Sequence, residues 1–259
     1  MPTRPLPALV TVLLLQACLP PPRAWLQAGP GGDDTGPGAA GDDTAEVEIP
    51  CRSLAFDEGE GHLTLYDEHL TDGSFITSDS FTVEFYSWFT SQVSGAEPRT
   101  LAALGADRAW RIAAGDDALI FSLEGASSEI RAAAPDTGWH HIALVHDRPL
   151  TEMRMYLDGA QVGAMDVEDL YPLPRADQDA LHVARAHGDG LSWPGPIDQL
   201  RFGLSVRHEG GSTQIDAPRS QDGWQGVWHF SGDITNTLSG EESSAGHAEF
   251  MDFCPTSGD

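Results

Sequence analysis

The sequence is poor in basic residues: 14 lysines and arginines stand against 40 aspartates and glutamates, which gives a formal net charge of −26. A surface with this excess repels phosphate backbones, so nucleic acid is a poor partner. The same excess can keep an exported protein soluble, or it can hold divalent cations where carboxylates cluster. Both uses of the acidic charge remain open at this point.

Several motifs of catalysis and of helical architecture are also missing. The sequence has no Gly-x-Ser-x-Gly nucleophile elbow, and no glycine-rich loop of the phosphate-binding kind. It has no amphipathic helical pattern longer than two turns, and no internal repeat at the period of a propeller or solenoid. These absences disfavour a serine hydrolase, a nucleotide-binding protein and a repeat protein.

Cysteine is scarce, and its three positions are Cys18, Cys51 and Cys254. An apolar run, Leu9–Leu15, follows Arg4 and is too short to span a bilayer as a mature helix, which is typical of a signal peptide. The next residues complete Leu-Gln-Ala-Cys, which resembles the lipobox of bacterial lipoproteins, whose signal is cut before an acylated cysteine. We therefore predict a lipoprotein signal peptide over residues 1–17 and a lipid on Cys18. An ordinary secretory signal that is cut nearby is the alternative.

With Cys18 lipidated, Cys51 and Cys254 are left as a pair in an oxidising compartment, and we predict a disulfide between them. Such a bridge requires the first and last strands of the folded region to be neighbours. Residues 18–48 are dominated by Pro, Gly, Asp, Ala and Thr without a periodic apolar face, which predicts a disordered tether. One domain is expected over 49–255, followed by a short tail at 256–259.

From Ile49 onward, short β-favouring segments alternate with turn signals about ten residues apart. The clearest segments are Phe81–Phe89, His141–His146 and Met153–Leu157. Asp158-Gly159 is a strong hairpin signal, because both positions can take positive φ. The pattern predicts an all-β fold, a two-sheet antiparallel jelly-roll sandwich.

The stretch Thr137–Gly163, TGWHHIALVHDRPLTEMRMYLDGAQVG, resembles the central hairpin of laminin-G-like, concanavalin-A-like jelly-roll domains. Three further regions agree with this resemblance in order and spacing: Ser53–Asp57 with Phe75–Trp88, Pro194–Phe202, and Gly226–Phe230. The resemblance covers about residues 50–254. It implies two curved antiparallel sheets with the chain ends on adjacent strands, which fits the predicted disulfide.

Three histidines within seven residues raise the question of a metal site. Successive residues of a strand alternate between faces, so His140 and His141 point in opposite directions. His140 and His146 share a face, but their Cα atoms are about 20 Å apart on a strand. Neither pair can share one metal ion. The family resemblance instead implies a structural role, with an imidazole bonded to backbone or to a neighbouring strand.

The resemblance also implies calcium as a candidate cofactor. Many relatives bind this ion through loop carboxylates and carbonyls, which suit a hard cation. Asp57 and Asp198 match acidic positions that serve a structural ion in some of these relatives. Salt bridges or turn caps are the competing interpretation of both residues.

Exposed indoles are the second kind of site to expect, because sugar-binding sites use them for stacking. Trp193 lies on a predicted loop and is the first candidate, and Trp224 is the second. Packing of Trp193 beneath its own loop is the alternative. Trp88, Trp139 and Trp228 lie in predicted strands, and we expect them in the core.

Glycoside hydrolysis is a further possibility, since concanavalin-like folds host it and it needs two carboxylates across a cleft. Asp166 and Glu168 share a face, but the closing glutamate of the usual motif is missing. We therefore expect a non-catalytic extracellular module that binds a glycan or a protein. Its lipid would hold it in the bacterial cell envelope, at the outer membrane or cell surface. A structural envelope component is the second hypothesis and an extracellular glycosidase the third.

Overall fold

The structure is a computed structural model. It describes residues 52–57, 60–65, 80–90, 97–105, 109–115, 117–170, 180–185, 192–208, 224–240, 243–252 and 255. All of these lie in the compact unit Val47–Asp259. The predicted signal peptide, tether and tail, and all three cysteines, fall outside the described residues, so those assignments stay predictions. Among the described residues, no helix has the length and apolar character needed to cross a membrane.

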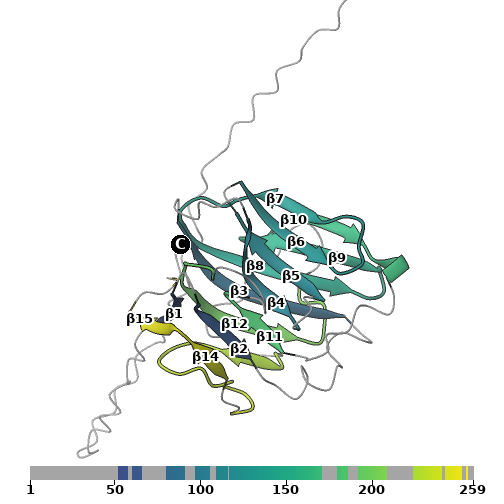
Figure 1. Cartoon of the computed structure of the whole chain (residues 1–259). Helices are drawn as coiled ribbons and strands as arrows, with labels where there is room; N and C mark the ends of the chain where they lie inside the picture. Colours follow the sequence, from purple (N-terminus) through teal and green to yellow (C-terminus); the bar gives the residue numbers. More distant parts are fainter. Residues whose placement is uncertain are drawn as a thin grey trace, which may run out of the picture. The chain divides into compact units, whose positions relative to one another are not determined.

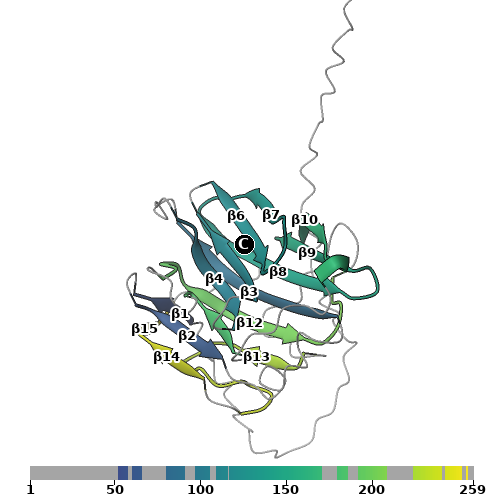
Figure 2. The ribbon, with the colours of Figure 1, turned by 45° about the vertical axis from the view of Figure 1, so that its right-hand side comes forward.

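The described residues form two antiparallel sheets, which confirms the predicted all-β sandwich (Figures 1 and 2). Sheet A runs in the order β10-β9-β8-β3-β12-β1-β15, with β13 paired to β12, and sheet B in the order β14-β2-β11-β4-β5-β6-β7. The strands of sheet A are β1 (Ser53–Phe56), β3 (Phe81–Phe89), β8 (Gly138–Asp147), β9 (Glu152–Leu157), β10 (Ala160–Asp166), β12 (Ile197–Gly203), β13 (Gly226–Trp228) and β15 (Ala248–Met251). Those of sheet B are β2 (His62–Leu65), β4 (Arg99–Leu104), β5 (Trp110–Ala114), β6 (Ala118–Leu123), β7 (Ile130–Ala133), β11 (Leu181–Val183) and β14 (Ser244–Gly246). A 3₁₀ helix, η1 (Glu168–Leu170), follows β10.

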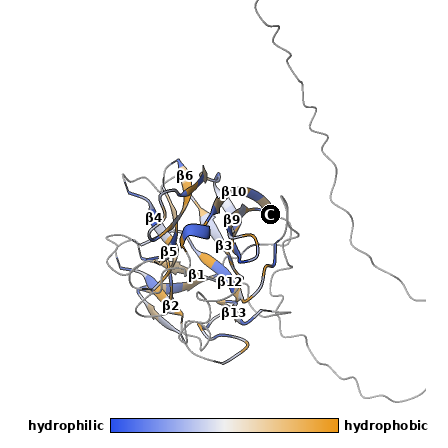
Figure 3. Cartoon of the chain, turned by 90° about the vertical axis from the view of Figure 1, so that its right-hand side faces the viewer, coloured by the Kyte–Doolittle hydropathy of each residue, from blue (hydrophilic) through white to orange (hydrophobic). Residues whose placement is uncertain are grey.

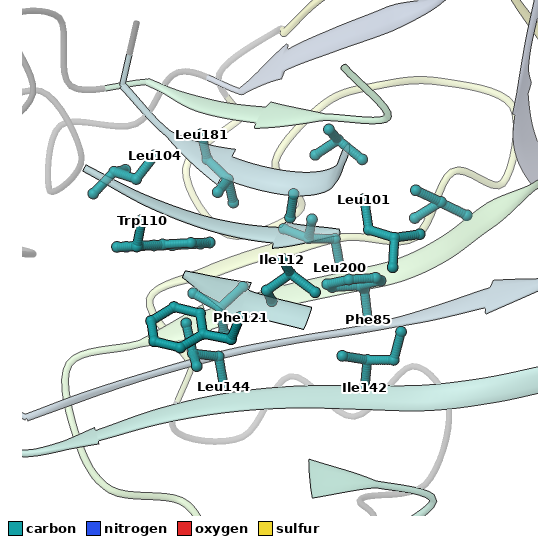
Figure 4. Close-up of a cluster of buried hydrophobic side chains, with 14 of the residues drawn as sticks. Phe85, Leu101, Leu104, Trp110, Ile112, Phe121, Ile142, Leu144, Leu181 and Leu200 are labelled. Atoms are coloured by element: carbon teal, nitrogen blue, oxygen red, sulfur yellow. The ribbon is translucent and has the colours of Figure 1, made fainter. Parts of the chain in front are cut away.

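The core lies between the two sheets and follows from strand alternation. In β3, Phe81, Val83 and Phe85 are buried in the apolar core, and the residues between them face the other side of sheet A. Figure 4 shows how the two layers meet: Phe85, Ile142, Leu144 and Leu200 come from sheet A, and Leu101, Leu104, Trp110, Ile112, Phe121 and Leu181 come from sheet B. Strand β6, whose residues are mostly apolar, carries the hydrophobic colour in Figure 3.

The first and last strands of the described chain are neighbours. Ser53–Phe56 pairs with the four residues of β15 in the register Ser53↔Met251 to Phe56↔Ala248. The Arg52 Nε atom also donates to Asp252 Oδ1 at 2.8 Å. This adjacency is what the predicted Cys51–Cys254 disulfide requires, since Cys51 lies two residues before β1 and Cys254 three residues after β15 in the sequence.

The hairpin predicted at Asp158-Gly159 is confirmed. β9 and β10 pair from Ala160↔Leu157 onward, so the connection between them has two residues. Asp158 has a φ of 49° and Gly159 a φ of 78°. Both values are positive. An Asp-Gly pair accepts this backbone conformation, which matches the twist of the flanking strands.

Candidate functional site: the outer face of sheet A

The face of sheet A that points away from the core carries polar side chains and a small apolar cluster of Ala143, Val145 and Tyr156, and at one end a segment of chain covers it. Thr82 of β3 donates its hydroxyl to the Ser205 carbonyl at 2.8 Å, and its oxygen accepts the Arg207 N–H at 3.1 Å. The Tyr156 hydroxyl donates to the His208 carbonyl at 3.3 Å. The segment Ser205–His208, which follows β12, is therefore fixed across β3, β8 and β9.

Beneath this segment lies a buried ionic cluster, formed by Glu84, His141, Arg201 and His208. Glu84 Oε2 accepts a hydrogen bond from His208 Nε2 at 2.7 Å and lies 3.5 Å from His141 Nε2. The Arg201 guanidinium pairs with Glu84 Oε1. The Glu84 and Arg201 side chains are 0% exposed, so solvent does not reach the pair.

The charge state of Glu84 follows from this geometry. Burial by itself would raise the pKa of the Glu84 carboxyl. The imidazoles of His141 and His208 and the charge of Arg201 outweigh burial and hold the pKa well below its ordinary value. Glu84 is therefore ionised at neutral pH, and its carboxylate is occupied by contacts within the protein. Its contacts hold a covering segment in place and leave no side of the carboxylate open to a substrate.

Next to the ionic cluster, the same face becomes aromatic and more open. Tyr86 and Trp88 follow Glu84 along β3 and are both half-buried. The Tyr86 ring lies 5.1 Å from the His141 ring, and the Trp88 ring meets Trp139 of β8 edge to face at 5.9 Å. We refer to Tyr86, Trp88 and Trp139 as the aromatic surface.

This arrangement corrects part of the expectation for the strand tryptophans. Trp228 is buried in the core between the sheets. Trp139 is buried as well, but it lies on the outer face, and Trp88 is only half-buried there. The signal was present in the sequence, because the alternation of FTVEFYSWF places Trp88 on the same face as Glu84 and Tyr86.

The expectation that Trp193 and Trp224 are exposed is wrong. Trp193 is 0% exposed and its ring lies 4.9 Å from Phe89, because its loop packs closely on β3. The Trp88 N–H donates to the Pro196 carbonyl at 2.9 Å, and a Cβ at Gly195 would collide with the Trp88 carbonyl oxygen.

Trp224 is 5% exposed. The Arg207 and Arg201 guanidinium groups lie over its ring, at 4.5 and 5.2 Å from the centroid. Neither Trp193 nor Trp224 therefore offers a free ring face on which a sugar could stack.

Asp57 and Asp198 are not brought together. β1 and β12 are antiparallel with Leu54 opposite Ile197, so the two aspartates lie on opposite sides of this pair, about 13 Å apart along the strands. Asp198 is buried, and its Oδ1 accepts the Gln199 N–H at 2.8 Å, whereas exposed Asp57 lies 3.9 Å from His247 Nδ1. The described part of the chain contains no group of three or more His, Cys, Asp or Glu side chains that could hold a metal. The two aspartates do not fit a shared calcium ion.

The carboxylates considered for hydrolysis have a local role. Asp166 Oδ1 accepts the Glu168 N–H at 2.8 Å and so caps the first turn of η1. Asp166, Glu168 and Asp169 are all exposed. A turn cap on an exposed helix does not set two carboxyl groups across a cleft, as glycoside hydrolysis requires.

The three histidines of β8 have three different environments. His140 Nδ1 lies 2.7 Å from Asp158 Oδ2, and its Nε2 lies 3.1 Å from the Asp136 carbonyl. His141 faces Glu84, and His146 packs in the interior with its ring 5.2 Å from Phe81. His140 and His141 point to opposite sides of sheet A. The three imidazoles therefore do not converge on a common metal ion.

Glu84, Arg201 and His208 were not among the residues predicted from the sequence. A signal existed for the first two, since each is a charged residue between two apolar residues of a strand, Glu84 between Val83 and Phe85 and Arg201 between Leu200 and Phe202. Such residues are buried only when they are paired. His208 gave no comparable signal, because it lies in a connection after β12.

Comparison with known proteins agrees with this architecture. A family model described as the concanavalin A-like lectin/glucanases superfamily (Laminin_G_3) matches residues 57–207, which is more than half of the chain. No curated protein sequence matches the chain.

Solved structures are similar at low identity. One is a candidate carbohydrate binding protein from Bacteroides ovatus ATCC 8483, with 15% identity and a TM-score of 0.53 over 77% of this chain and 59% of that one. Another is the CBM40 of the Ruminococcus gnavus IT-sialidase bound to α2,3 sialyllactose, with 13% identity and a TM-score of 0.49 over 60% of this chain and 90% of that one. A SAP-like pentraxin from Limulus polyphemus has 13% identity and a TM-score of 0.46 over 79% of this chain and 96% of that one. The present chain thus spans less than two thirds of the Bacteroides protein, and identities this low establish the fold alone.

Proposed function

We propose a binding function for this chain, which belongs to the concanavalin A-like lectin/glucanases superfamily. The superfamily name covers both lectins and glucanases, so membership does not by itself choose between binding and catalysis. The outer face of sheet A supports the proposal of binding. Our proposal is a non-catalytic module that recognises a glycan through the half-buried Tyr86 and Trp88 of the aromatic surface, in which the buried Trp139 supports the Trp88 ring.

The observation that carries the proposal is the half-buried Trp88. Its indole stands on a sheet, is fixed by the Trp139 edge contact at 5.9 Å, and keeps part of its surface open. A rigid aromatic side chain offers a large apolar contact area and loses little conformational entropy on binding. Beside it, the Tyr86 hydroxyl supplies a group that can exchange hydrogen bonds with sugar hydroxyls.

Catalysis is disfavoured by what the available carboxylates already do. Glu84 is enclosed by Arg201, His141 and His208, and Asp166 caps η1. Hydrolysis of a glycosidic bond needs two carboxyl groups about 5–10 Å apart on either side of the scissile bond. The candidates that we singled out do not have this arrangement. The proposal does not use calcium, because Asp57 and Asp198 do not converge.

We also propose that a lipid on Cys18 holds the domain at the bacterial cell envelope, on the outer membrane or cell surface. The Leu-Gln-Ala-Cys motif and the Pro-, Gly- and Asp-rich stretch over residues 18–48 support this placement. In this arrangement the tether would carry the binding surface away from the membrane. Mass spectrometry of the protein from a bacterial host tests this part, since an acylated N-terminal Cys18 is expected and a free amino terminus elsewhere would contradict it.

A glycan array probed with the full mature protein tests the binding function. We expect binding to a defined set of glycans, and we expect Trp88→Ala to abolish it while circular dichroism stays unchanged. Leu150→Ala, which removes a 61% exposed side chain at the turn between β8 and β9, is the control and should bind normally. Release of reducing sugar would instead support the glycosidase. A stable protein partner without glycan binding would support the structural envelope role.

A further inference from the structure

The beginning of β8 is paired with a neighbouring strand on one side only. Its first residues pair with β3, where Trp139 is the register partner of Trp88. On the other side, the ladder with β9 starts only at Ile142, so residues 138–140 extend beyond β9. Strand ends with few backbone hydrogen bonds are the parts of a fold that open most readily. This end carries Trp139, whose ring supports the Trp88 ring, so its position bears on the aromatic surface.

The side chain of His140 connects this end of β8 to two other parts of the chain. Its Nδ1 atom lies 2.7 Å from Oδ2 of Asp158, at the turn between β9 and β10. Its Nε2 atom lies 3.1 Å from the Asp136 carbonyl oxygen and 3.2 Å from Asp136 Oδ1, in the segment before β8. Asp158 Oδ1 also accepts the His141 N–H at 2.9 Å. We refer to Asp136, His140 and Asp158 as the histidine clasp.

Both ring nitrogens of His140 face oxygen atoms that can only accept hydrogen bonds. A carbonyl oxygen has no proton to donate, and an ionised carboxylate has none either. The neutral imidazole carries one N–H and satisfies only one of these two neighbours, whereas the imidazolium donates from both nitrogens. The distance of 2.7 Å to Asp158 also lies in the range of charge-assisted hydrogen bonds. The histidine clasp is therefore complete only when His140 is protonated.

The surroundings of the His140 ring favour a positive charge. The side chain is 12% exposed, and its ion-pair partners among the described residues are the carboxylates of Asp136 and Asp158. From β3, the Phe89 ring meets it edge to face at 5.7 Å and brings no charge. His141, the next residue of β8, points to the opposite side of sheet A. A proton on the His140 ring thus meets two negative charges, and histidine is the side chain that gains or loses a proton near neutral pH.

We infer that His140 is a positioning residue for the aromatic surface and that it acts in its protonated form. This inference rests on the proposed glycan-binding function and adds its regulation by pH. The closed clasp fixes the backbone on both sides of Trp139, the neighbour of His140 in β8, and so holds the indole that supports Trp88. The clasp is strong on the acid side of neutrality and weakens as the pH rises, because the imidazolium then loses its proton. Glycan binding should weaken in the same direction.

Circular dichroism measures the relative position of the two indoles without a ligand. Indoles that meet edge to face at 5.9 Å couple their electronic transitions, which gives a pair of bands of opposite sign. The difference between the spectra of wild type and Trp88→Phe assigns these bands to Trp88 and Trp139. In the full mature protein, we expect the bands to weaken as the pH is raised from about 5.5 to about 8.5, where histidine loses its charge. Bands of constant intensity over this interval would overturn the inference.

Two variants and a matched control assign the effect to the histidine clasp. His140→Asn supplies an amide donor but cannot titrate, so its bands should be the same at both ends of the pH interval. Asp158→Asn keeps an acceptor for the His141 N–H and tolerates positive φ, but it removes one of the two charges and should reduce the pH effect.

His247→Asn is the control, because His247 also lies between two carboxylates, those of Asp57 and Glu60. It precedes β15, at the edge of sheet A that lies away from β8, and its φ of 51° suits asparagine. The bands of His247→Asn should respond to pH as those of wild type do. A wild-type response in His140→Asn would contradict the role assigned to His140.

The glycan array distinguishes failure of the inference from failure of the proposed function. Serial dilutions of the protein on the array should show binding about two- to fivefold tighter at the acid end of the pH interval, the size of one exposed ion pair. His140→Asn should bind the same glycans equally at both ends. Binding that is lost in Trp88→Ala but does not change with pH leaves the function standing and overturns the inference. If no glycan binds at either pH, the proposed function is overturned together with its regulation by pH, whatever the circular dichroism bands show.

Discussion

Glu84 and His208 are separated by 124 residues in the chain, yet Glu84 Oε2 and His208 Nε2 lie 2.7 Å apart. This hydrogen bond joins the middle of β3 to the segment that crosses the outer face of sheet A. Arg201 and His141 face the same carboxylate from β12 and β8. One buried acidic side chain therefore holds three strands and a connecting segment together, and its removal should be costly.

Replacement of Glu84 by glutamine is the direct test. It would leave the Arg201 guanidinium buried without a charged partner, and breaking a buried pair in this way costs about 3–5 kcal/mol. We expect the free energy of unfolding to fall by that amount in urea titrations followed by circular dichroism. Glu249→Gln on exposed β15 should change it by less than about 0.5 kcal/mol. Equal stability of the two variants would contradict the role assigned to Glu84.

The acid dependence of stability follows from the same carboxylate. The pKa of Glu84 is lower in the folded protein than its ordinary value of 4.5, so the folded state releases this proton more readily than the unfolded state. The resulting stabilisation is fully present above pH 4.5 and is lost as the pH falls below that value. Urea titrations at a series of acidic pH values should show a steeper loss of stability for wild type than for Glu84→Gln. Parallel slopes would show that Glu84 does not couple to folding.

Two tryptophans should respond differently to truncation. Trp193 is fully buried against Phe89, and its replacement by alanine leaves a large cavity, which costs about 3–5 kcal/mol. Trp88 is half-buried on the outer face, so Trp88→Ala should lose clearly less stability while it abolishes glycan binding. Thermal unfolding of the two variants measures the difference. If Trp88→Ala is the more destabilising change, Trp88 is chiefly a packing residue and the aromatic surface is not a binding site.

The disulfide prediction is tested on the mature protein before reduction. Peptide mapping should find Cys51 linked to Cys254, whose flanking strands β1 and β15 are paired. Reduction should lower the free energy of unfolding by a few kcal/mol, because the bridge closes a long loop and restricts the unfolded chain. In the double variant with serine at both positions, reductant should not change the free energy of unfolding. Two free thiols in the untreated protein would refute the pairing.

Local patterns in the sequence were sufficient for the strands and for much of the topology. Strand alternation assigned His140 and His141 to opposite faces, and the Asp158-Gly159 pair located the hairpin. These features depend on residues that are close in the chain, so a local pattern can reveal them. The order of the motifs also indicated the sandwich and the meeting of its first and last strands, which the β1–β15 pairing provides.

Contacts between distant segments determine where the candidate site residues lie, and local sequence patterns did not predict these positions. Trp193 looked exposed because it lies on a loop, but the loop packs onto β3 and buries the ring. Asp57 and Asp198 looked like partners, but the register of β1 and β12 separates them.

The sequence by itself determined the strand faces, the hairpin turn and the fold class, because period-two alternation and turn chemistry act over a few residues. Only the tertiary structure decided which side chains meet. The ionic cluster needs β3, β8, β12 and the segment after β12 at one point, and the aromatic surface needs β3 beside β8. Pairings of this kind depend on strand order and register, which neighbouring residues in the chain do not specify.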